Sequence, residues 1–115
     1  MSIEQRIEKL EYYCSLMLDM IVPEKKPFYA LVIRYGLTKQ EVEDTLRLCE
    51  QLSEQYKQQK EEGFVIFTTL FTEFAGALHP NLPLAETIDA LKQQQLFVPL
   101  MTEFQRLITY AQRMK

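Results

Sequence analysis

Apolar residues at the start of the chain recur at alternating spacings of four and three. The series is Ile3, Ile7, Leu10, Cys14, Met17 and Ile21. Such spacing is the a/d seam of a helix that packs lengthwise against another helix. Ser2 and Gln5 add a capping-box pattern at its start, and Pro23 cannot continue it. We therefore expect a helix over residues 3–22, with its more apolar second half covered on more than one side.

The same helical period returns along the rest of the chain, interrupted only where Gly and Pro fall. Thr38 and Glu41 form a second capping box, and Gly36 stands where a left-handed residue commonly closes a helix. The further helices are expected over residues 28–35, 38–60, 64–78 and 84–94, and from 98 onward. Residues 1–115 thus predict a single all-α domain, a compact multi-helical bundle of about five to six helices.

The segment 64–78 has almost no charge. Its face repeats Phe64, Phe67, Phe71, Phe74 and Leu78, and Glu73 is the only charged residue between Gly63 and Ala85. A helix without a charged face is usually surrounded by neighbours or covered by another subunit. We expect this helix to be central.

Composition excludes several classes of protein. Of the 115 residues 47% are hydrophobic and 25% charged, with a net charge of -3, so the chain is expected to fold and offers no basic field for nucleic acid or anionic lipid. It contains no apolar run of about 18 residues, which excludes a membrane-spanning helix. No secretory signal is recognisable, and we expect a cytoplasmic protein with Cys14 and Cys49 reduced and buried.

Several blocks of sequence occur together. They are 6–13 (Arg-Ile-Glu-Lys-Leu-Glu-Tyr-Tyr), 27–31, 36–41, 48–49, 52–54, 63–65, 74–76, 86–88 and 90–91. As a set they resemble the YhaI-like family of small uncharacterised proteins from Bacillus and its relatives, over nearly the whole chain. The resemblance implies an all-helical fold and a bacterial cytoplasmic setting. It implies no catalytic residue.

The sequence offers little support for a catalytic site, a metal site or a DNA-binding site. His79 is the only histidine, and the two cysteines are 35 positions apart, so the spacing of a zinc site is missing. We expect no enzyme activity and no cofactor, with His79 exposed or capping a helix. A helix-turn-helix around Gly36 is a distant third possibility, because residues 38–54 carry five acids against Lys39 and Arg47.

Three charged residues lie in apolar surroundings: Asp19, Arg34 and Glu73. Each could occupy a narrow exposed strip, or two could form a structural ion pair. The sharper hypothesis is a polar pocket between helices that recognises a small ligand. This makes a small-ligand sensor the alternative function.

Amphipathic and apolar residues gather in the first helix. The candidate interface residues are Tyr12, Tyr13, Leu16, Met17, Met20 and Ile21. Tyrosine and methionine are enriched at protein interfaces. The preferred hypothesis is therefore a non-enzymatic protein–protein interaction module that forms a homo-oligomer, with an unidentified protein partner also possible.

Overall fold

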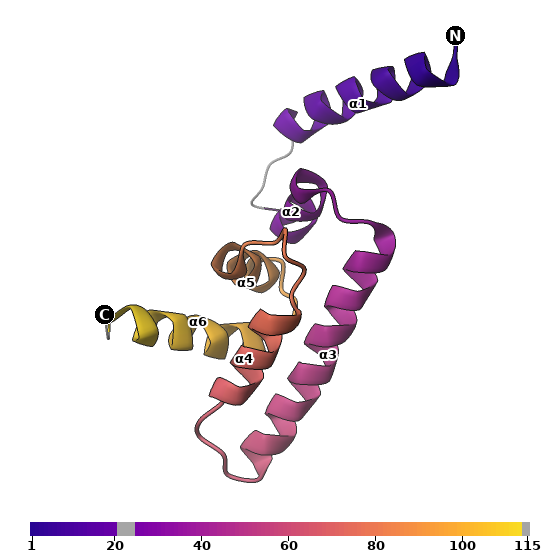
Figure 1. Cartoon of the computed structure of the whole chain (residues 1–115). Coiled ribbons are helices and arrows are strands. Elements are labelled where there is room, and N and C mark those ends of the chain that lie inside the picture. The colour runs from indigo at the N-terminus through magenta and orange to yellow at the C-terminus, as the bar shows by residue number, and fades with distance from the viewer. Residues whose placement is uncertain (21–24, 114–115) are drawn as a thin grey trace.

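The computed structural model describes residues 1–20 and 25–113, and their secondary structure is entirely helical (Figure 1). Six helices follow one another: α1 Ile3–Met20, α2 Pro27–Tyr35, α3 Lys39–Glu61, α4 Thr68–Ala77, α5 Leu84–Gln93 and α6 Val98–Arg113. The predicted all-α class and number of helices are confirmed. Ile21 and Val22, which the sequence assigns to the first helix, lie outside the described residues.

The ends of α2 and α3 are fixed by the residues that the sequence marks. Gly36 follows α2 with φ +70°, a left-handed conformation in which a Cβ would be strained. At the start of α3 the Glu41 N–H donates to Thr38 Oγ1 at 3.2 Å, and the Thr38 N–H donates to Glu41 Oε1 at 2.8 Å. The capping box therefore satisfies two amides that the helix itself leaves free.

Helices α2 to α6 share one hydrophobic core. Its fully buried side chains include Phe28, Cys49, Leu52, Phe74, Ile88, Leu91, Leu100, Met101 and Phe104. The rings of Phe74 and Phe104 join α4 to α6 with centroids 5.1 Å apart. Each of these helices buries only one stripe, and its opposite face is solvated.

The connection between α5 and α6 is tight and unusual. Gln95 and Phe97 have positive φ angles of 64° and 52°, which residues other than glycine rarely adopt. Just before them, Gln94 Oε1 accepts the N–H groups of Phe28 at 3.0 Å and Tyr29 at 3.4 Å. A side chain at the end of α5 thus caps the start of α2, although no residue next to α2 does so.

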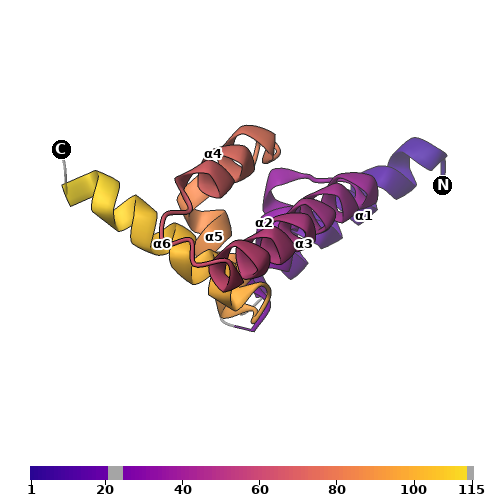
Figure 2. The same ribbon diagram turned by 90° about the horizontal axis from the view of Figure 1, so that it is seen from below.

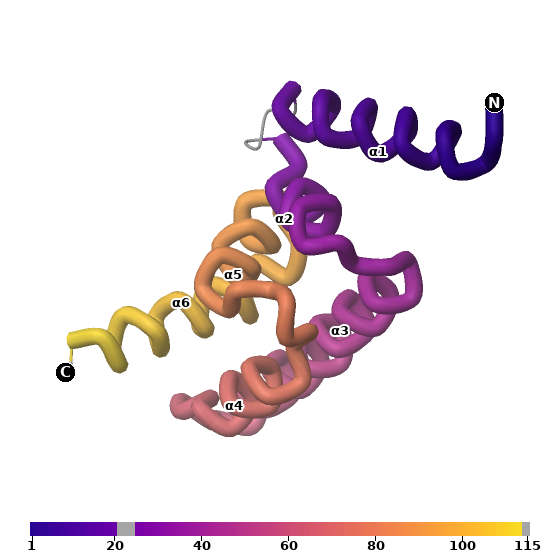
Figure 3. The backbone as a smooth tube through the Cα atoms, turned by 45° about the horizontal axis from the view of Figure 1, so that its top comes forward, coloured from indigo at the N-terminus to yellow at the C-terminus, as the bar shows by residue number. Residues whose placement is uncertain are grey.

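Helix α1 stands apart from this core. It runs away from the other helices and meets them only near its C-terminal end, beside α2 (Figures 1 and 3). Seen from below, α1 and α6 leave the body toward opposite sides, so the described ends of the chain lie far apart (Figure 2). The resulting shape measures 62 × 27 × 24 Å.

No residue of α1 is buried, so the cover expected for its second half does not come from the described part of this chain. One expectation about this helix was wrong: Cys14 is exposed, whereas Cys49 is buried as expected. A seam of period 3.5 shows that a helix needs a partner, but it does not show whether that partner belongs to the same chain.

The predicted central helix is shorter and less enclosed than its composition indicates. It begins at Thr68 rather than Phe64, and within it only Leu70 and Phe74 are buried. Phe64, Val65 and Ile66 form an exposed stretch before it, with Val65 77% exposed. Phe64 is aromatic and Val65 and Ile66 are β-branched, which gives the stretch low helix propensity, and a chain turn at Gly63 (φ +93°) precedes it. The low charge of residues 64–78 therefore does not reflect burial of the whole segment.

Candidate functional site: the exposed face of α1

Most of the large hydrophobic side chains of α1 face solvent. Among the predicted interface residues, Tyr12, Tyr13, Leu16, Met17 and Met20 are all exposed, Met17 by 54% of its surface. Ile21 lies outside the described residues. The structure thus places five of the six predicted residues on one helix that the rest of the chain leaves uncovered.

The exposed surface extends further toward the N-terminus than the sequence indicates. Ile3 is 73% exposed and Leu10 is 61% exposed, and Ile7 and Cys14 are exposed as well. The sequence assigns these residues to a helical seam, which could be buried within the chain or between chains, and they were left out of the candidate interface. We call the row formed by Ile3, Ile7, Leu10, Cys14 and Met17 the α1 seam.

An exposed surface of this kind needs an explanation. Single exposed hydrophobic residues are common on soluble proteins, but contiguous apolar surface usually marks a contact site for a protein, ligand or membrane. The α1 seam is continuous because its members are three or four residues apart and therefore lie above one another on the helix. Only Leu18 of this helix is partly buried.

The three residues of the predicted polar pocket are all exposed. Asp19 belongs to α1, Arg34 to α2 and Glu73 to α4. None of the three takes part in an ion pair of the described residues. The exposure of each residue agrees with the simpler alternative, a charged position on an exposed strip of its helix.

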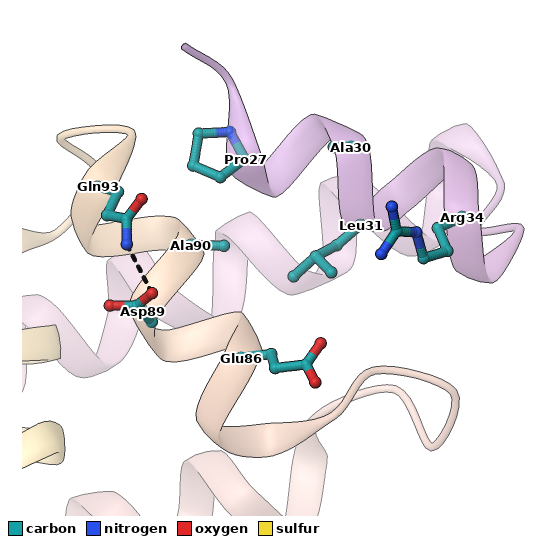
Figure 4. A pocket seen from close by; sticks show the side chains of 8 residues that line it. All are labelled: Pro27, Ala30, Leu31, Arg34, Glu86, Asp89, Ala90 and Gln93. Atoms are coloured by element: carbon teal, nitrogen blue, oxygen red, sulfur yellow. Dashed lines mark hydrogen bonds between the residues drawn. The ribbon is translucent and has the colours of Figure 1, made fainter. Parts of the chain in front are cut away.

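Arg34 does line a groove, but with other residues. The groove lies between α2 and α5, has a cavity volume of about 260 Å³, and includes Glu86, Asp89 and Gln93 on its α5 side (Figure 4). Gln93 Nε2 donates to Asp89 Oδ2 at 2.6 Å, so that carboxylate is already occupied. The groove is smaller than the roughly 300–1,000 Å³ typical of small-molecule sites.

His79 has a structural partner that the sequence did not reveal. Its Nδ1 accepts the Asn81 N–H at 3.1 Å, so Nε2 carries the proton and donates to Glu41 Oε2 at 2.5 Å. Of the two predicted roles, exposed or capping a helix, the structure is closer to the second, since His79 is half-buried and hydrogen-bonds the capping-box residue Glu41 of α3. The hydrogen bonds from Thr38, and then that from His79, lower the pKa of Glu41.

Chemistry-bearing groups are not clustered elsewhere. Residues 1–20 and 25–113 contain no group of three or more His, Cys, Asp or Glu side chains placed to hold a metal ion. Burial raises the pKa of Cys49 to about 12, which leaves its thiol protonated and unreactive. Helix α2 packs mainly on α5 rather than on α3, unlike the paired helices of a helix-turn-helix.

The family of the chain follows from its whole length. A family model described as "Protein of unknown function (DUF1878)" matches residues 1–109. The chain belongs to this family. The matched span of this DUF1878 domain contains all of α1 to α5 and most of α6, so the projecting helix α1 lies inside the family match. None of the helices in the described part is long and apolar enough to cross a membrane.

Proposed function

We propose that this protein is a cytoplasmic, non-enzymatic interaction module that self-associates through the apolar surface of α1. The observation that carries the proposal is an 18-residue helix with a continuous apolar seam and no buried residue. Removing that seam from water would stabilise an assembly by about 25 cal/mol for each Å² of apolar surface buried. The quoted sequence blocks further favour a relationship to the YhaI-like proteins of Bacillus.

Self-association would also stabilise the helical conformation of α1. Isolated helices of fewer than about 12–15 residues are marginal in water, and even longer ones gain most of their stability from packing. The α1 helix packs on its own chain only near α2. A partner along the seam would supply the packing that the rest of the chain does not.

The test is sedimentation velocity from low to high micromolar concentration, on the wild type and on Leu10→Glu. Leu10 touches no core and is 61% exposed, so its substitution leaves the folded body intact. We expect the wild type to sediment as an oligomer at the higher concentrations. The Leu10→Glu variant should remain monomeric, because a carboxylate in a buried seam must be desolvated.

Val65→Glu serves as the matched control, since Val65 is also exposed and apolar but lies outside α1. It should self-associate like the wild type. A strictly monomeric wild type at high micromolar concentration would refute the proposal. Loss of association in the Val65 variant alone would move the contact surface to residues 64–66.

A small-ligand sensor is the second candidate, and the α2–α5 groove is the observation that favours it. Arg34 supplies one cation there, and Glu86 one carboxylate with no ion-pair partner among the described residues (Figure 4). These charges suit a zwitterionic metabolite small enough for a groove of about 260 Å³, such as a free amino acid. A thermal-shift screen with amino acids should then raise the melting temperature of the wild type but not of Arg34→Ala.

A further inference from the structure

The charges that flank the α1 seam have a consequence for the orientation of a partner helix. The spacing places Ile7 and Cys14 at a positions and Ile3, Leu10 and Met17 at d positions of a heptad. The flanking e positions are then Glu4, Glu11 and Leu18, and the g positions are Arg6, Tyr13 and Met20. Residues at e and g set partner choice and orientation in coiled coils.

In a parallel pair, each g residue lies beside the e residue five positions later on the other helix. Arg6 then faces Glu11 of the second copy, twice by symmetry, and Tyr13 faces Leu18. Both kinds of contact are complementary, one by charge and one by apolar character. Neither Arg6 nor Glu11 has an ion-pair partner within the described part of the chain, so both are available.

In an antiparallel pair, e positions meet e positions and g positions meet g positions. The alignment that overlaps the seams best puts Glu11 against Glu11 of the second copy, and Arg6 against Met20. Like charges in such neighbouring positions are destabilising, and the arginine loses its partner. The charge pattern therefore favours the parallel arrangement over the antiparallel one.

We infer that the partner of α1 is the same helix of a second copy, in parallel and in register, forming a two-stranded coiled coil. The inference rests on the proposed self-association and adds the occupant and its direction. The central pair, Ile7 at a with Leu10 at d, is the combination that favours two strands, whereas Ile3 at d does not add to this preference. The two folded bodies then lie at the same end of the coil.

Helix α1 is long enough to form such a pair, but too short for a dimer of high affinity. Its 18 residues span about 27 Å, or roughly two and a half heptads. Coiled coils that are stable alone usually have three to four heptads. We therefore expect dissociation in the micromolar range, and the measurements need to cover it.

Cys14 offers a direct readout, because a positions face each other only in a parallel, in-register pair. Cys49 is buried, so Cys14 is the one reactive thiol among the described cysteines. Mild oxidation of the full-length wild type with diamide should give a disulfide-linked dimer. Cys14→Ser should give none, and neither should wild type diluted well below the dissociation constant.

Two further variants separate the two orientations. Glu11→Gln removes the Arg6–Glu11 pairs of the parallel coil and should weaken self-association about fivefold, whereas it relieves the Glu11–Glu11 repulsion of an antiparallel coil and would tighten it. A tagged Leu10→Cys, Cys14→Ser chain mixed with wild type should form no mixed disulfide in the parallel coil. In the antiparallel coil, residues 10 and 14 are neighbours and would cross-link.

The outcomes distinguish this inference from the function on which it rests. A Cys14–Cys14 cross-link with weaker association of Glu11→Gln supports the parallel coil. An oligomer that Leu10→Glu disrupts, but that cross-links residue 10 to residue 14 and tightens with Glu11→Gln, overturns the parallel coil and leaves self-association standing. A monomer at every concentration overturns both. Circular dichroism of each variant verifies its fold.

Discussion

The side-chain carbonyl oxygen of Gln94 accepts the backbone N–H of Phe28 at 3.0 Å, across 66 positions of the chain. It couples the end of α5 to the start of α2, where the first-turn amides have no partner in their own helix. Phe28 itself is fully buried. The start of a core helix is therefore stabilised by a residue distant in sequence.

Gln94→Ala should lower the free energy of unfolding by about 1 kcal/mol, the usual cost of losing a helix cap. Urea unfolding followed by circular dichroism measures it. Gln94→Glu is the control: its carboxylate retains the acceptor and faces a helix N-terminus, so stability should be kept or raised. Equal losses in both variants would contradict the capping role.

Thr87→Val should raise the free energy of unfolding by about 1 kcal/mol, because Thr87 is fully buried and its hydroxyl has no hydrogen-bond partner in the structure. Thr45→Val is the matched control, since the Thr45 hydroxyl donates to the Glu41 carbonyl at 2.8 Å. That variant should be no more stable than the wild type. Stabilisation of both, or of neither, would show that the two hydroxyls are equivalent.

Glu41 should make stability depend on pH in the acidic range. Its pKa in the folded chain lies below the ordinary value of 4.5, through the hydrogen bonds from Thr38 and His79. The stabilisation is therefore present above about pH 4.5 and is lost as the pH falls through the folded-state pKa. Unfolding of Glu41→Gln from neutral to acidic pH should lack this component, whereas Asp44→Asn, an exposed control, should keep it.

Cys49 should not react with thiol reagents in the folded protein, because burial raises its pKa to about 12. The Cys14→Ser variant isolates this residue. In native buffer its labelling by an aromatic disulfide should be slow and limited by unfolding, and in denaturant it should be immediate and complete. Rapid labelling of the native variant would show that the core opens around α3.

The fold was predictable where local signals decide it. The capping box of Thr38 and Glu41 and the left-handed Gly36 define the turn between α2 and α3, and both were readable in the sequence. Helix α4 was predicted too long, because Phe64 and Phe67 fit a helical period that the backbone does not follow before Thr68. The positive φ angles of Gln95 and Phe97 had no sequence signal, since neither residue is glycine.

The sequence predicted only part of the candidate site, because local spacing does not show which residues the fold leaves exposed. Tyr12 was singled out as an amphipathic residue typical of interfaces, and Leu16 and Met20 because they belong to more apolar surface than one neighbouring helix would cover. All three are exposed. Ile3 and Leu10 were missed, since their spacing is the same whether the partner helix is in the chain or outside it. Asp19, Arg34 and Glu73 were grouped by their apolar surroundings in sequence, and they lie on three different helices.

The sequence by itself determined that this chain is helical and that α1 carries an apolar seam, because period and capping act through residues within a few positions of one another. Only the tertiary structure decided which seams are filled. Helices α2 to α6 bury their stripes against each other, while α1 leaves its stripe in solvent. Burial depends on contacts between residues distant in sequence, such as Gln94 with Phe28, and no local pattern specifies those.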